Sequence, residues 1–179
     1  MLAAPAPYQL RALQLADLDA VYAIDRLAFP TPSKKGLYEY ELTRNPMAHY
    51  QALLLENVLL GYVGYWLIAD EAHISTIATH PDWRGKKLGE LLLLNMLYMA
   101  GEHPATQATL EVRRSNTIAQ ALYRKYAFIV EGERPRYYRD TGDDALIMTV
   151  ILNDNYYAHT LNALRQALWV HLTSAPSAP

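Results

Sequence analysis

The chain contains no cysteine, and none of its six histidines stands four residues from another. The absence of cysteine excludes disulfides, thiolate metal sites and cysteine nucleophiles. The scattered histidines also lack the spacing of common zinc sites, so we expect no bound metal. The longest apolar stretch, residues 88–100, is interrupted by polar side chains. It falls short of the ~18 continuous apolar residues of a membrane span, so no membrane partner is expected.

Excess charge of either sign is also missing, because 16 Lys and Arg residues face 18 Asp and Glu residues, a net charge of −2. This balance argues against a protein whose main role is to bind nucleic acid. A length of 179 residues with 51% hydrophobic content fits one globular domain with a single core. The first residues do not have the pattern of a secretory signal, so we expect a cytoplasmic location.

The hydrophobic pattern predicts the order β-α-α-β-β-β-α-β-α-β-β, followed by one more helix. This order is typical of an α/β domain with one mixed sheet and helices on both faces. Strands are expected at 8–13, 49–55, 58–68, 72–79, 106–113, 128–133 and 144–152, and helices at 16–28, 34–44, 88–100, 117–126 and 155–172. The predicted organisation is a flexible leader at 1–7, the domain at 8–153, an additional helix at 154–173 and a tail at 174–179.

A basic, glycine-containing turn, Arg84 to Gly89, leads into the apolar helix at 88–100. The first turn of a helix presents unpaired N–H groups and the positive end of the helix dipole, which together attract phosphate. Gly85 and Gly89 let the backbone approach a ligand closely, and the basic side chains add positive charge. The turn therefore favours a phosphate site, although a solvated basic loop remains the alternative.

A second polar cluster follows the strand at 106–113, where Glu111 alternates with apolar neighbours. Partial burial in an apolar sheet would raise the pKa of this carboxyl and suit it to be a general base near neutral pH. Asn116 and Tyr123 follow at the start and within the next helix. The alternatives are a glutamate paired with a nearby arginine, an asparagine that caps the helix and a tyrosine that only packs.

Together these segments resemble the GNAT superfamily of acetyl-CoA-dependent N-acetyltransferases, and more narrowly its RimI branch, which acts on ribosomal protein S18. The resemblance covers about Tyr8 to Leu152. The motifs that carry it are Leu110-Glu111-Val112-Arg113-x-Ser115-Asn116-x-x-Ala119-x-x-Leu122-Tyr123, Ala28-Phe29-Pro30, Tyr137-Tyr138 and Asp144-Ala145-x-Ile147-Met148. The family's phosphate signature, Gln/Arg-x-x-Gly-x-Gly/Ala, falls on Arg84 to Gly89.

The resemblance implies a mostly antiparallel sheet that splays at the cofactor site, and acetyl transfer from acetyl-CoA to the N-terminal α-amine of a protein. Glu111 would be the general base and Tyr123 the general acid. The implied acetyl-CoA contacts are Ile77, Ala78, Thr79, Arg84, Gly85, Lys86, Lys87, Leu88, Gly89 and Asn116. The implied acceptor groove is framed by Phe29, Pro30, Tyr137 and Tyr138, unless the tyrosines are strand packing only. The N-terminal alanine of ribosomal protein S18 is the implied acceptor.

Three positions depart from the family pattern. Lys87 replaces the middle glycine of the phosphate signature, a harmless change only if this residue has ordinary helical angles. Thr31-Pro32-Ser33 stands where a tryptophan-serine pair usually follows Phe29-Pro30, which affects the expected peptide groove. Ala127 replaces the glycine that usually precedes the phenylalanine near the final hairpin.

Two other functions remain open from the sequence. Within the same fold, the acceptor could be a small amine or a lysine side chain. Alternatively, the chain could be a CoA-binding regulatory module without turnover, with residues 155–172 docking a partner. A nucleic-acid binder is disfavoured because the basic residues are not interleaved with aromatic ones. The oligomeric state is not indicated.

Overall fold

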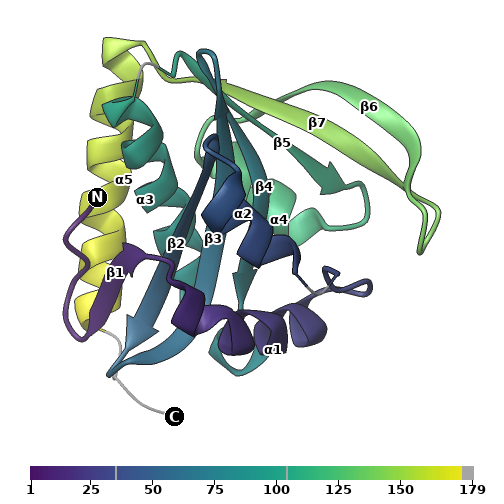
Figure 1. Ribbon diagram of the computed structural model, residues 1–179. Helices are drawn as coiled ribbons and strands as arrows, with labels where there is room; N and C mark the ends of the chain where they lie inside the picture. The colour runs from purple at the N-terminus through teal and green to yellow at the C-terminus, as the bar shows by residue number, and fades with distance from the viewer. Residues whose placement is uncertain (35, 104, 175–179) are drawn as a thin grey trace.

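A computed structural model describes residues 1–34, 36–103 and 105–174. One seven-stranded sheet has the order β1-β2-β3-β4-β5-β7-β6, in which only β4 and β5 are parallel (Figure 1). The strands are β1 Tyr8–Ala12, β2 Ala48–Leu55, β3 Val58–Ile68, β4 Glu71–Thr79, β5 Gln107–Arg113, β6 Ile129–Tyr138 and β7 Asp143–Ile151. The helices are α1 Leu18–Ala28, α2 Leu37–Arg44, α3 Leu88–Glu102, α4 Thr117–Lys125 and α5 Asn155–Ser174, with short 3-10 turns at Leu15–Asp17 and Pro81–Trp83. The predicted mixed architecture is confirmed.

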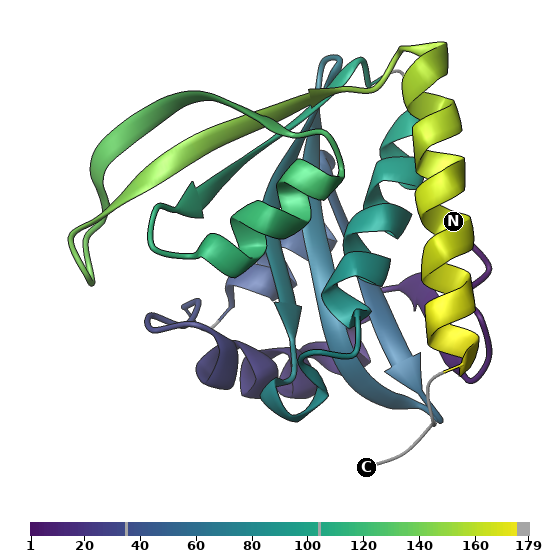
Figure 2. The same cartoon turned by 180° about the vertical axis from the view of Figure 1, so that it is seen from behind.

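Helices cover both faces of the sheet, as predicted (Figure 1, Figure 2). Helices α1 and α2 close one face over a small core that includes Val21, Ile24 and Tyr62. Helix α3 packs on the opposite face, between the sheet and α5. This placement explains why α3 is apolar nearly all round, since a helix with neighbours on two sides buries a wider stripe.

The sheet splays between its two parallel strands. In the part of the chain that the structure describes, β4 and β5 pair only from Glu71 opposite Gln107 to Ile74 opposite Leu110. The register of β4 against β3 then shifts by one residue at Ser75, which is a β-bulge. A bulge bends its strand, so the carboxyl ends of β4 and β5 diverge (Figure 2). The opening between them is the feature that positions the site.

Strand β6 runs further than the predicted segment 128–133 and reaches Tyr138. Pro135 does not end it, because β6 is the edge strand and one side of its backbone needs no partner. The register against β7 is irregular between Arg134 and Tyr138, and Arg136 has a φ of 51°. The long hairpin of β6 and β7 therefore extends beyond the body of the domain (Figure 1).

The first residues of the chain and helix α5 both lie against α3. At residues 1–7, the Leu2 N–H donates to Asn95 Oδ1 at 2.9 Å and the terminal ammonium lies 3.2 Å from Glu102; whether this segment moves in solution stays a prediction. Helix α5 buries Leu161 and Leu168 in the main core, so these side chains are not offered to a partner. The expected tail, apart from its first residue, lies outside the described residues. Among these residues, no helix is long and apolar enough to cross a membrane.

Candidate active site

A carboxylate lies at the mouth of the opening between β4 and β5. Glu111 directly follows the last paired residue of β5, and 11% of its side chain is exposed. His73 Nε2 on β4 lies 3.1 Å from Glu111 Oε2, and an Arg134 guanidinium nitrogen on β6 lies 3.3 Å from Oε1. The His73 ring stacks on Trp66 of β3 at 5.7 Å between centroids. Three strands therefore hold this carboxylate.

These partners reverse the expected shift in the pKa of Glu111. The sequence predicted a raised value from burial, and this was wrong. The hydrogen bond from His73 lowers the pKa of Glu111, the charges of His73 and Arg134 add to that effect, and together they outweigh burial. The same hydrogen bond raises the pKa of His73. Glu111 is therefore a stable anion near neutral pH.

A half-buried tyrosine lies on α4. The half-buried ring of Tyr123 packs against Phe128 at 5.7 Å between centroids. Burial raises the pKa of Tyr123, with a smaller contribution from Tyr138, so the phenol keeps its proton at neutral pH. Tyr138 Oη also donates to the backbone oxygen of Glu111 at 3.3 Å. Tyr138 thus contacts the strand of the carboxylate and acts electrostatically on the phenol.

The basic turn before α3 requires left-handed backbone at two positions. Gly85 has a φ of 78°, and Lys87, the residue that caps the helix, has a φ of 62°. Lys87 therefore lacks the ordinary helical angles under which its replacement of glycine would be harmless. Its ammonium lies 3.5 Å from the buried carboxylate of Glu90, which also binds Lys125. The Lys87 side chain is thus drawn back toward its own helix.

Backbone N–H groups of β4 line the opening beyond Ile74, where β4 no longer pairs with β5. The His80 N–H bonds to Leu60 O at 2.8 Å, and bonded and non-bonded pairs alternate along an antiparallel ladder. Ala78 is therefore bonded to β3, whereas the N–H groups of Ile77 and Thr79 point away from it. The first turn of α3 adds further unpaired N–H groups.

Gly89 and Asn116 are two of the predicted acetyl-CoA contacts whose surroundings within the protein are defined. A Cβ built on Gly89 would meet no protein atom nearer than the Thr79 methyl at 3.9 Å. Packing within the protein therefore does not require a glycine at this position. Asn116 Oδ1 accepts from the Ala119 N–H at 3.1 Å, so this side chain caps α4. Its contact with acetyl-CoA stays a prediction.

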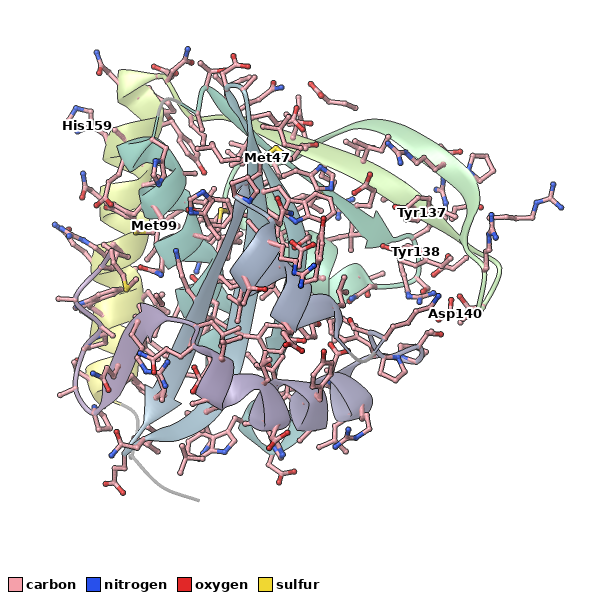
Figure 3. The ribbon with its side chains drawn as sticks, in the orientation of Figure 1. Met47, Met99, Tyr137, Tyr138, Asp140 and His159 are labelled. Atoms are coloured by element: carbon pink, nitrogen blue, oxygen red, sulfur yellow. The ribbon has the colours of Figure 1, made fainter. Side chains whose placement is uncertain are left out.

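A cavity of about 340 Å³ lies on the α1 and α2 face of the sheet, next to the β4 bulge. It is lined by Phe29, Thr31, Ser33, Leu37, Tyr38, Glu41, Tyr50, Trp66, Ser75 and Thr76. Of the four residues predicted to frame an acceptor groove, only Phe29 lines this cavity. Tyr137 and Tyr138 lie on the hairpin beside the end of β5 (Figure 3), with ring centroids 5.2 Å apart. Pro30 is exposed beside Phe29.

The loop that carries Phe29 is fixed at both ends. Buried Asp25 accepts hydrogen bonds from the Ser33 N–H, from Tyr38 at 2.8 Å and from Tyr62 at 2.5 Å. These contacts anchor the loop to the sheet and place Phe29 at the rim of the cavity.

The same loop is tied to the turn between β6 and β7. Thr31 Oγ1 donates to Asp140 Oδ2 at 2.9 Å, and Arg113 donates to the same oxygen at 2.7 Å. Figure 3 labels Asp140. Arg113 is the main reason that the pKa of Asp140 falls to about 2, so this carboxylate is charged near neutral pH. The position where the family usually has tryptophan thus holds a hydroxyl that joins the loop of Phe29 to the hairpin of the two tyrosines.

A family model described as "Acetyltransferase (GNAT) family" matches residues 18–128, which include the basic turn, Glu111 and Tyr123. The chain belongs to this family. As a GNAT protein with N-acetyltransferase relatives, it is an acetyl-CoA-dependent N-acetyltransferase, as predicted.

Several relatives match this GNAT enzyme over nearly their full length. A Bacillus subtilis protein, named as a candidate ribosomal protein bS18-alanine N-acetyltransferase, is 41% identical over 81% of this chain and 96% of its own. The N-alpha-acetyltransferase RimI of Mycobacterium tuberculosis is 32% identical over 79% of this chain and 91% of its own. The crystal structure of the ribosomal-protein-S18-alanine N-acetyltransferase from Escherichia coli has a TM-score of 0.76 at 26% identity, over 82% of this chain and 95% of its own.

The sequence left an arginine partner for Glu111 open, which the Arg134 contact bears out, but it did not say which arginine and did not identify His73. His73 and Arg134 lie on other strands, and only the register of β4 against β5 brings His73 beside Glu111. One signal was present, because Glu71 and His73 alternate with apolar residues as Thr109 and Glu111 do. Two neighbouring strands with polar residues at every second position place them on one shared face.

Proposed function

We propose that this GNAT enzyme acetylates the N-terminal α-amine of a protein, with the N-terminal alanine of ribosomal protein S18 as the first acceptor to test. The proposal depends on the opening between β4 and β5, which has an anionic carboxylate and a cavity on the same side of the sheet. Trp66 links the two, because it lines the cavity and stacks on His73, the partner of Glu111. The names of the three relatives above support a protein N-terminus as acceptor.

In the proposed reaction the pyrophosphate of acetyl-CoA binds at the N-terminus of α3, where unpaired N–H groups and the helix dipole favour negative charge. The N–H groups of Ile77 and Thr79 donate to the thioester oxygen as negative charge develops on it. The acceptor enters from the cavity side. Much of the acceleration comes from holding amine and thioester together in the opening.

Glu111 takes the proton from the attacking nitrogen, directly or through a water molecule. A peptide α-amine has a pKa of about 7.7–8.0, so part of it is uncharged near neutral pH. The carboxylate then has to accept only the one proton that the nitrogen loses as it attacks the thioester. The lowered pKa of Glu111 keeps the carboxylate ionised for this step. Tyr123 remains protonated because burial raises its pKa, and it donates to the sulfur of the departing CoA thiolate.

Peptide labelling tests the acceptor. Three peptides are incubated with acetyl-CoA: one with a free N-terminus and no lysine, the same peptide with a blocked N-terminus, and a blocked peptide with one lysine. Only the first should gain an acetyl group. Equal labelling of the blocked lysine peptide would instead assign the side-chain amine as acceptor. A peptide with the N-terminal residues of S18, compared with a scrambled version, tests the finer assignment.

Substitutions test the proton transfers. Glu111→Gln and Tyr123→Phe should each lower kcat about 100-fold or more, with little change in KM. Glu131→Gln and Tyr156→Phe are matched controls at exposed positions and should leave kcat unchanged. Near-normal kcat in Glu111→Gln would remove this residue from the mechanism. Turnover by the unmodified enzyme would exclude a CoA-binding module without catalysis.

A further inference from the structure

A buried carboxylate in the acceptor cavity has no cationic partner among the described residues. Glu41 of α2 is 5% exposed and lines the cavity. Its Oε2 accepts from Trp66 Nε1 at 2.7 Å and from Asn45 Nδ2 at 3.0 Å. None of the ion pairs within residues 1–34, 36–103 and 105–174 includes Glu41.

The second oxygen of this carboxylate, Oε1, has no hydrogen-bond partner among the described residues. In the described part of the chain, only Tyr65 Oη is a side-chain polar atom that is both fully buried and without a hydrogen bond. Oε1 of Glu41 has no hydrogen bond either, so it must be partly accessible. Since Glu41 itself lines the cavity, this oxygen is available to a group bound there.

Because Glu41 is buried, its lack of a cationic partner among the described residues has an energetic consequence. An ionised carboxylate is costly to remove from water unless an opposite charge and hydrogen bonds compensate it. Two neutral donors on one oxygen leave the charge of Glu41 unmatched. A ligand that brings a positive charge into the cavity would therefore gain a charge-assisted hydrogen bond.

The position of Glu41 indicates that this ligand is the acceptor. Trp66 donates its indole N–H to Glu41, and its ring stacks on His73, which binds Glu111. A single stacked pair of side chains thus separates the cavity acid from the proposed general base. An acceptor whose amine reaches Glu111 can therefore place a neighbouring group in the cavity.

We propose that Glu41 selects acceptors that carry a second cation close to the reacting amine, namely a lysine or arginine side chain near the protein N-terminus. This inference rests on the proposed function. The cavity of about 340 Å³ lies within the usual range for ligand pockets of about 300–1,000 Å³. Phe29, Leu37 and Tyr50 line it beside Glu41 and suit the aliphatic stem of such a side chain.

Peptides that differ only in lysine or norleucine at positions one, two or three test the selection. The unmodified enzyme should prefer lysine at one of these positions by about tenfold in kcat/KM. Glu41→Gln keeps the acceptor atom for Trp66 and Asn45 and should reduce this preference to near unity. Glu39→Gln, on the exposed side of the same helix, is the matched control and should keep it.

Two further arms separate this inference from the proposed function. A short diamine is compared with a monoamine of equal length, and binding of every compound is measured by tryptophan fluorescence without turnover. If only the diamine is acetylated, and Glu41→Gln removes its advantage, the cation site stands and the protein acceptor is wrong. If peptides are acetylated with no preference for lysine, or with a preference that Glu41→Gln leaves intact, the cation site is wrong. It is also wrong if no compound binds with a dependence on Glu41.

Discussion

Replacing Lys87 by glycine should stabilise the protein although it removes a charged side chain from the proposed phosphate site. Lys87 holds a φ of 62° at the start of α3, and left-handed backbone costs a residue with a Cβ about 1–2 kcal/mol. Glycine avoids that cost but loses about 0.5–1 kcal/mol through the greater freedom of the unfolded chain. The difference predicts a gain of about 0.5–1 kcal/mol.

The ion pair of Lys87 with Glu90 reduces this gain only slightly. The Lys87 side chain is 44% exposed, so water screens the pair, and exposed ion pairs contribute about 0–1 kcal/mol. Lys125 remains on the same carboxylate when Lys87 is replaced. Lys87→Ala separates the two effects, because alanine removes the ion pair but keeps the Cβ.

Urea unfolding followed by circular dichroism measures the prediction. The glycine variant should exceed the alanine variant by about 0.5–1 kcal/mol at an unchanged urea dependence, or by about 1–4 °C in Tm for a chain of this size. An alanine variant as stable as the glycine variant would refute the view that Lys87 is held in strained backbone.

Ala127 follows α4 with a φ of 62°, so Ala127→Gly should also raise the free energy of unfolding in urea, and a decrease would contradict the same reasoning. The pair of His73 and Glu111 should stabilise the fold most between about pH 4.5 and 6.5, their ordinary pKa values. That stability is lost as pH rises through the raised pKa of His73, or falls through the lowered pKa of Glu111. Urea titrations of His73→Gln should therefore show the largest deficit inside this window, and a deficit independent of pH would remove the ion pair as its cause. Thr31→Val removes the hydroxyl that holds Asp140 and should raise KM for the peptide several-fold without changing KM for acetyl-CoA; equal increases in both would indicate general damage.

Local signals predicted most of the fold. The strand pair around Glu56-Asn57 was found from its alternation and turn residues, and both turn residues have positive φ, as a tight hairpin requires. The extent of β6 was not found, because Pro135 stops a strand except at an edge, and the strand order is not visible in sequence. The bulge at Ser75 was also missed, since the neighbouring strand defines it.

The site shows the same division between local and distant information. The sequence located Glu111 by its alternation with apolar neighbours, and the direction of its pKa was wrong because His73 and Arg134 come from other strands. The capping role of Asn116 was kept open as an alternative to a cofactor contact, and it could be raised from sequence because a helix cap depends on residues within one turn. Glu41 was not identified, because only the packing of α2 over β3 brings it to Trp66.

The position of β7 in the sheet limits how short a fragment of this protein can be and still fold. Residues 18–128, which match the family model, include β5 but not the strand that pairs with it along its whole length. In a fragment that ends at residue 128, β5 would be paired only with β4, over a short ladder. The leucines of α3 that α5 covers would be exposed, and Glu111 would lose its contact with Arg134. The shortest piece expected to refold independently therefore extends through α5.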